Sequence, residues 1–94
     1  LDDVFKAGVE KLKSGMIDDA IHLFSSLTML RPESFGSYFN LGVAYAKMRR
    51  YGVSIEMFDR ALAINPNHEM ARSYRQKVHE LQLRFGEEQG GHQG

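Results

Sequence analysis

The sequence of 94 residues has no cysteine, no excess of one charge and no long apolar run. Without cysteine, neither a disulfide framework nor a thiolate metal site can form, and the composition fits a reducing compartment, which favours a cytoplasmic location. No apolar stretch approaches the roughly 20 residues of a membrane-spanning helix, and no secretory leader is visible. The first residue is Leu1 rather than Met, as in a processed or excised piece of a longer protein.

Positive and negative charges balance, because Lys and Arg total 12 and Asp and Glu also total 12. This balance gives no reason to expect a nucleic acid or an anionic membrane as partner. One stretch near the end is basic through Arg72, Arg75, Lys77 and Arg84. A single-strand-binding site would interleave such charges with exposed aromatic rings. The aromatic residues here fall instead on the helix stripe that is predicted to be buried, which consists of Met70, Tyr74, Val78, Leu81 and Phe85. We therefore expect no nucleic-acid partner.

Catalytic and metal-binding patterns are also missing. The four histidines, His22, His68, His79 and His92, include no pair spaced three or four residues apart on one predicted helix. There is no nucleophile elbow, phosphate-binding loop or pair of catalytic carboxylates. The sequence therefore predicts a protein that is not an enzyme and has no cofactor, metal or catalytic residue.

The strongest positive signal is a repeat with a period of 34 residues. The residues that recur unchanged are Phe5, Gly8, Val9, Lys13, Ile21, Phe24 and Pro32, which return as Phe39, Gly42, Val43, Lys47, Ile55, Phe58 and Pro66. A fixed period of this length is typical of stacked helix-turn-helix units. Such arrays usually serve as recognition surfaces, so the period favours a binding function.

Hydrophobic periodicity predicts five helices, and Gly and Pro residues mark the breaks between them. The predicted helices cover residues 2–14, 18–30, 36–48, 51–63 and about 68–85. The predicted organisation is one small domain, 1–85, with a first repeat at 1–34, a second at 35–68, a capping helix at 69–85 and a disordered tail at 86–94.

The repeat resembles the tetratricopeptide repeat (TPR) family over residues 1–85. The residues that carry the family pattern in the second repeat are Tyr38, Leu41, Gly42, Tyr45, Ser54, Phe58, Ala61 and Pro66. Their counterparts in the first repeat are Val4, Ala7, Gly8, Lys11, Ala20, Phe24, Leu27 and Pro32. The resemblance implies an all-α, right-handed α-solenoid of two repeats plus a C-terminal capping helix. Lys11, Leu27 and Ser54 depart from the pattern and predict looser packing where they lie.

The array is predicted to end at the fifth helix. The positions at which a following helix would pack are occupied by Arg72, Arg75, Gln76 and His79, which prefer water. The sequence favours a self-contained module of two repeats and a capping helix. The alternative is that the chain is a segment of a longer repeat array.

In this family the first helix of each repeat lines a concave groove, and ligands usually lie there. The resemblance places the following residues in that groove: Phe5, Val9, Leu12, Lys13, Phe39, Asn40, Val43, Ala46, Lys47, Ser73 and Lys77. The opposite faces of the same helices already hold a core set, so Phe5, Val9, Phe39 and Val43 are predicted to be uncovered. The alternative is that these four residues complete a thin core.

One subset of the family clamps the terminal carboxylate of chaperone tails. That clamp would need Lys at Phe5, Asn at Val9, Asn at Asn40, Lys at Met70 and Arg at Tyr74, and only Asn40 matches. We therefore expect no carboxylate clamp.

The predicted function is a non-catalytic protein–protein interaction module that binds an apolar or amphipathic segment of a partner protein. Lys13, Lys47 and Lys77 at the rim of the groove would favour acidic residues flanking that segment. Two alternatives stay open at this point, namely homo-oligomerisation and a role as recruitment domain of a larger enzyme or assembly.

Overall fold

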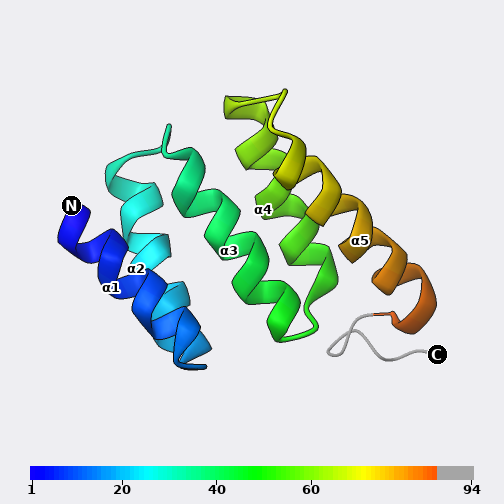
Figure 1. The fold of residues 1–94 in the computed structure, drawn as a ribbon, viewed down its shortest axis with the longest axis horizontal. Coiled ribbons are helices and arrows are strands. Elements are labelled where there is room, and N and C mark those ends of the chain that lie inside the picture. Colours follow the sequence, from blue (N-terminus) through cyan, green and yellow to red (C-terminus); the bar gives the residue numbers. More distant parts are fainter. Residues whose placement is uncertain (87–94) are drawn as a thin grey trace.

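The computed structural model describes residues 1–86, and these residues form five α-helices and no strand (Figure 1). The helices are α1 (Asp2–Lys13), α2 (Ile17–Leu30), α3 (Phe35–Lys47), α4 (Tyr51–Ile64) and α5 (Glu69–Phe85). Every predicted helix end lies within one residue of the observed end. The all-α prediction is confirmed, whereas the predicted tail, apart from Gly86, lies outside the described residues.

Turn residues account for where the first two helices end. Gly15 has a φ of +81°, a left-handed conformation that glycine adopts without strain, and α1 ends just before it at Lys13. Pro32 biases the preceding residue away from helical geometry, and Arg31 has a φ of −135° and a ψ of 80°. Local backbone chemistry therefore separates α1 from α2 and α2 from α3.

Side-chain caps begin two of the helices. The Ser34 hydroxyl accepts a hydrogen bond from the backbone N–H of Ser37 at the start of α3, with 3.4 Å between the nitrogen and the oxygen. The Nδ1 atom of His68 accepts one from the N–H of Ala71 at the start of α5, at 3.2 Å. Each cap satisfies one of the backbone donors that the first turn of a helix leaves unpaired.

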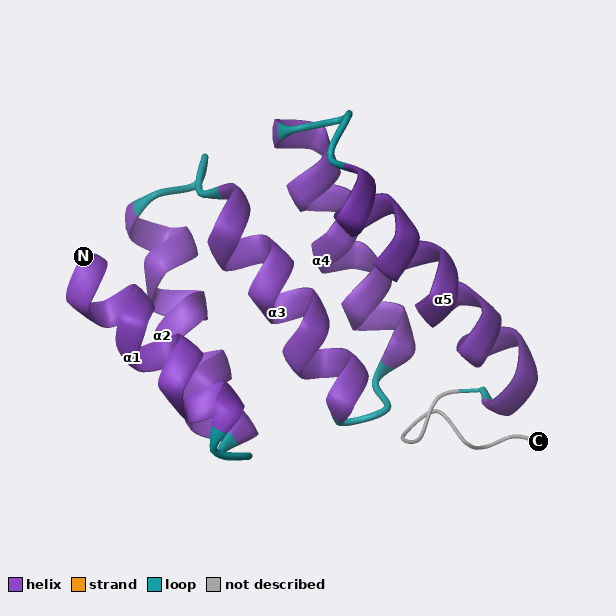
Figure 2. Ribbon diagram, in the orientation of Figure 1, coloured by secondary structure: helices purple, strands orange, loops and turns teal. Residues whose placement is uncertain are grey.

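The helices stack as two hairpins, α1 with α2 and α3 with α4, followed by α5. Figure 1 shows α1, α3 and α5 side by side and running in the same direction, with α2 and α4 behind them. Figure 2 shows the connecting loops at alternating ends of the stack. We call the surface formed by α1, α3 and α5 the odd-helix face.

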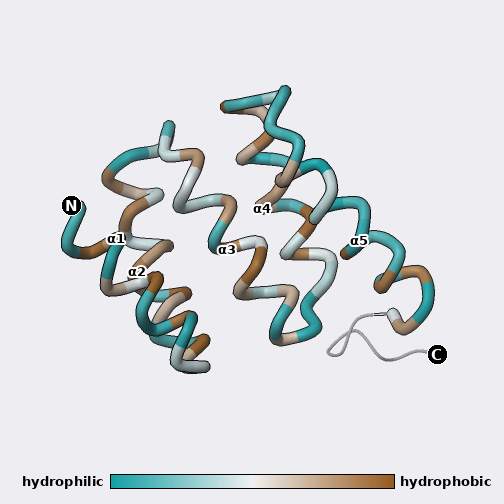
Figure 3. The backbone as a smooth tube through the Cα atoms, viewed as in Figure 1, coloured by the Kyte–Doolittle hydropathy of each residue, from teal (hydrophilic) through white to brown (hydrophobic). Residues whose placement is uncertain are grey.

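The core consists of two clusters, one around Phe24 of α2 and one around Phe58 of α4. The first is built on Ala20, Phe24, Leu27 and Leu41, and the second on Tyr51, Phe58 and Val78. Phe24 and Phe58 are fully buried, and their rings lie against Gly8 and Gly42 respectively. Figure 3 shows apolar and polar residues alternating along the helices, as amphipathic helices of a layered array require.

Two departures from the family pattern are well packed, so the prediction of looser packing is wrong at both. Ser54 is fully buried, and its hydroxyl donates a 2.6 Å hydrogen bond to the backbone carbonyl of Gly42. Leu27 is buried in the first core cluster. The third departure, Lys11, is half-buried and places its ammonium 3.9 Å from the sulfur of Met16.

The outer side of α5 is polar and faces water. Arg72, Gln76 and His79 are exposed, as the sequence predicted. Arg75 is half-buried because its guanidinium pairs with the Asp59 carboxylate of α4. The pair ties α5 to α4 on the side where a following helix would pack.

Candidate protein-binding face

The residues predicted to line the groove all lie on α1, α3 or α5. Their apolar members are half-buried and packed against the two core clusters: Phe5, Val9 and Leu12 on the first, and Phe39, Val43 and Ala46 on the second. The expectation that Phe5, Val9, Phe39 and Val43 are uncovered is therefore wrong. They complete a thin core, which was the alternative reading.

Ring contacts explain this burial. Phe5 meets the buried Phe24 edge to face with ring centroids 5.4 Å apart, and Phe39 meets Phe58 in the same manner at 5.7 Å. Phe5 also reaches α3, where a Cβ atom added at Gly36 would lie 3.0 Å from its ring. An odd-numbered helix thus packs on the even-numbered helix of its own repeat and also approaches the next odd-numbered helix. Both of its apolar faces therefore pack against neighbouring helices, whereas only one was predicted to do so.

Uncovered apolar side chains are found instead on α5. Its stripe was predicted to be buried, but Met70 is 54% exposed, Tyr74 is 39% exposed and Phe85 is also exposed, while Val78 is buried. Tyr74 packs on Phe39 of α3 and Phe58 of α4 from one side, and the rest of its ring stays in contact with solvent.

Tyr74 belongs to a continuous group of aromatic rings, which we call the aromatic ledge (Phe35, Phe39, His68 and Tyr74). The centroids of Phe39 and Tyr74 lie 5.4 Å apart, those of Phe35 and Phe39 lie 5.8 Å apart, and those of Phe35 and His68 lie 4.4 Å apart. Tyr74 also touches the buried Phe58 ring. The ledge therefore joins the beginnings of α3 and α5. Sequence reasoning placed only Phe39 at the site, because no repeated motif marks the other three residues.

Cations follow toward the carboxyl ends of the odd-numbered helices. Lys13 and Lys47 are exposed in the last turns of α1 and α3, where a positive charge interacts favourably with the helix dipole. On α5, Lys77 and Arg84 line a shallow depression of about 210 Å³ together with Glu80 and Leu81. Because the three helices run in the same direction, the odd-helix face has aromatic rings at the beginnings of α3 and α5 and cations toward its other end.

The two polar site residues in the middle of the face differ in how available they are. The Asn40 side-chain amide donates a 2.8 Å hydrogen bond to the Gly36 carbonyl, so this donor is used within α3. Ser73 is exposed on α5. The single match to the carboxylate clamp is thus engaged with its own helix, and the clamp positions at Met70 and Tyr74 offer apolar surface instead of cations.

Residues 1–86 provide neither a metal site nor a membrane-spanning helix. No group of three or more His, Asp or Glu side chains there is arranged to hold a metal ion. Within the same residues, no helix is long and apolar enough to cross a membrane.

Comparison with known proteins supports the relationship that the repeat suggested. The profile of the tetratricopeptide repeat family matches residues 35–68, which are the bounds predicted for the second repeat. Superkiller protein 3 of Saccharomyces cerevisiae is 31% identical over 68 residues, a stretch that covers 72% of this chain and 5% of that relative. With its stacked helix-turn-helix units, the chain belongs to the tetratricopeptide repeat family.

Proposed function

We propose that this chain is a non-catalytic module that binds an apolar or amphipathic segment of a partner protein across the odd-helix face. Repeats of this family generally mediate protein–protein interaction and are typically non-catalytic. The observation that carries the proposal is the exposure of Met70 and Tyr74 beside the half-buried Phe39. Contiguous exposed apolar side chains commonly mark interaction sites.

The aromatic ledge suits this role because its rings are already held in place. Tyr74 is supported by Phe39 on one side and Phe58 on another, so little side-chain freedom remains to be lost when a partner binds. Burying a whole side chain of this kind contributes roughly 1.5–3 kcal/mol. Covering the exposed half of Met70 and of Tyr74 would therefore contribute about 1 kcal/mol each.

Charge suggests how the partner segment is oriented. The segment would place an apolar anchor on the ledge and an acidic residue toward Lys47, Lys77 and Arg84. Exposed charge pairs add little affinity, but they raise the association rate and select the register of binding. Binding is expected to weaken modestly as salt rises.

The proposal can be tested with peptides selected from a random display library on the wild-type protein. The double variant Met70→Ser/Tyr74→Ser should weaken binding of the selected peptides about tenfold to thirtyfold, measured as Kd by fluorescence polarisation. Tyr74 also packs on Phe39 and Phe58, so the melting temperature should fall, and Kd is compared at a temperature at which both proteins are fully folded. Alanine at Phe5 and Phe39 is a poorer choice, because both rings pack on the core and the variant would lose stability.

A matched control is provided by Met29 and Leu30 at the end of α2, which are 84% and 64% exposed. Replacing both by serine removes more exposed apolar surface than Met70→Ser/Tyr74→Ser does, but away from the odd-helix face, and should leave Kd unchanged. Equal weakening by the two double variants, or wild-type binding by Met70→Ser/Tyr74→Ser, would refute the proposal.

Two alternatives use the same face. In the first, a second copy of the chain covers Met70 and Tyr74, and sedimentation velocity over a concentration series would then give a dimer that the double variant loses. In the second, the module recruits a partner to a larger enzyme or assembly. The aligned stretch makes up 5% of Superkiller protein 3, so the activity of that whole protein is not transferred to this chain.

A further inference from the structure

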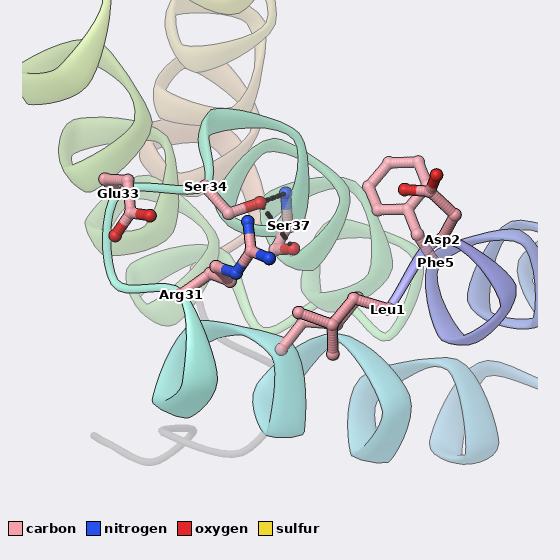
Figure 4. Close-up of a pocket in the computed structure, with 8 residues that line it drawn as sticks. Leu1, Asp2, Phe5, Arg31, Glu33, Ser34 and Ser37 are labelled. Carbon is pink, nitrogen blue, oxygen red and sulfur yellow. Dashed lines mark hydrogen bonds between the residues drawn. The ribbon is translucent and has the colours of Figure 1, made fainter.

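A pocket of about 290 Å³ lies where the start of α1, the end of α2 and the start of α3 meet (Figure 4). Its lining consists of Leu1, Asp2, Phe5, Leu27, Arg31, Glu33, Ser34 and Ser37. Phe5 belongs to the odd-helix face, so the pocket adjoins one end of that face.

The repeat provides an internal comparison for this pocket. Moving each lining residue by 34 positions gives Phe35, Gly36, Phe39, Ala61, Asn65, Asn67, His68 and Ala71 at the junction between α3, α4 and α5. There the Phe35 ring lies 4.4 Å from the His68 ring and 5.8 Å from the Phe39 ring, centroid to centroid. Two rings thus occupy the place that is open at the first junction. Leu1 and Ser34 stand at the corresponding positions and bring no ring.

We propose that this pocket binds an aromatic side chain of the partner segment, in the place that Phe35 and His68 fill at the second junction. The inference rests on the proposed function and names one anchor of the same partner. A cavity of about 150 Å³ lined by apolar side chains is large enough to take up benzene, so 290 Å³ is ample room for a ring.

The walls of the pocket suit a ring better than a polar ligand. Phe5 and Leu27 provide apolar surface, and Phe5 is placed to make a further ring contact. The hydroxyls of Ser34 and Ser37 are hydrogen-bonded to each other at 2.8 Å, so they require no partner from a ligand. These two hydroxyls of the wall are therefore already satisfied.

Arg31 adds a cation at the edge of the pocket. Figure 4 shows its side chain extending from the end of α2 toward the bonded pair Ser34 and Ser37. A guanidinium in this position can stack on a bound ring, as Arg50 does on Tyr45 with 5.4 Å from its Cζ atom to the ring centroid. Asp2 and Glu33 outnumber Arg31 in the lining, so an anionic ligand is disfavoured.

Side-chain analogues serve as probes of the pocket. Titrating the ¹⁵N-labelled chain with 4-methylphenol should give saturable shifts at the backbone amides of Phe5, Ser34 and Ser37. Its saturated counterpart, 4-methylcyclohexanol, should bind at least fivefold more weakly. Absence of saturable shifts at these amides, or equal binding of the two probes, would overturn the proposal.

Variants that exchange the two junctions give a matched control. Leu1→Phe/Ser34→His introduces the residues of the second junction and should weaken probe binding at least tenfold. The reverse change, Phe35→Leu/His68→Ser, should create a second site with shifts at Ala71. Wild-type binding of the probe by a folded Leu1→Phe/Ser34→His protein would overturn the proposal. Arg31→Gln provides a separate test and should weaken the binding of 4-methylphenol at least threefold.

The outcomes separate this inference from the proposed function. A library peptide whose binding is lost in Met70→Ser/Tyr74→Ser but retained in Leu1→Phe/Ser34→His would overturn the aromatic anchor and leave the odd-helix face as the binding surface. Shifts at the Ser34 and Ser37 amides on concentrating the protein without a probe would assign the pocket to a second copy of the chain and overturn the aromatic partner.

Discussion

Replacing Gly42 by alanine tests the close crossing of α3 and α4. A Cβ atom added at Gly42 would lie 2.7 Å from Cε1 and 2.8 Å from Cδ1 and Cζ of Phe58, well inside normal contact distance. The Phe58 ring cannot easily move away, because it is fully buried and touched by the rings of Phe39 and Tyr74. The added methyl group must therefore push α3 and α4 apart or force a strained rotamer.

Two opposing effects set the magnitude. Alanine is the better helix former and would stabilise α3 by about 1 kcal/mol relative to glycine. Overpacking a tight core costs about 1–3 kcal/mol, and the overlap with three ring atoms of Phe58 places this crossing near the upper end. The net loss in the free energy of unfolding of Gly42→Ala is therefore about 1–2 kcal/mol. For a domain of this size, that corresponds to a melting temperature lower by roughly 5–15 °C.

Thermal and urea unfolding followed by circular dichroism would measure the change. Ser73→Ala on the exposed part of α5 is the control for helix propensity and should change stability by less than about 0.5 kcal/mol. In a Phe58→Leu background the same Gly42→Ala change should cost less, because leucine has no ring atoms at the point of overlap. A Gly42→Ala protein as stable as wild type, or more stable, would refute the argument.

Two further predictions concern polar contacts between helices. Ser54→Ala removes the buried hydroxyl that donates to the Gly42 carbonyl and should lower the free energy of unfolding by about 1 kcal/mol in urea titrations, and a change near zero would contradict this role. Asp59→Asn breaks the ion pair between Asp59 and Arg75, whose side chains are 53% and 38% exposed respectively. The change should lower the free energy of unfolding by no more than about 1 kcal/mol at low salt. That cost should shrink further in 1 M NaCl, and a loss that salt does not reduce would argue against an electrostatic contribution.

The helices could be predicted because their signals are local. Gly15 and Pro32 act on neighbouring backbone geometry, and the hydrophobic periods of the two repeats agree, so the predicted ends lie within one residue of those observed. The burial of Phe5 and Phe39 could not be predicted in the same way, because it depends on their contacts with the Phe24 and Phe58 rings of α2 and α4 and, for Phe5, on the approach of α3. These contacts are set by long-range packing.

The candidate site was therefore predicted only in part. The odd-helix face is the surface that the repeat pattern indicated, and Lys13, Lys47 and Lys77 are exposed on it. Tyr74 was interpreted as core because its spacing matches the buried Val78, although spacing alone does not reveal that α5 is covered from one side. The pocket at the first junction was not predicted. It arises because Leu1 and Ser34 stand where the second junction has the rings of Phe35 and His68, and neither position belongs to the family pattern.

The two junctions differ in how firmly they are sealed. The rings of Phe35, Phe39 and His68 join α3 to the start of α5, whereas the first junction leaves an open pocket beside Phe5. Although the sequence is nearly periodic, its two junctions are therefore not interchangeable. A ligand lying along the odd-helix face would meet a filled surface at one end and a recess at the other, so the face can distinguish the two polarities in which an extended segment could dock.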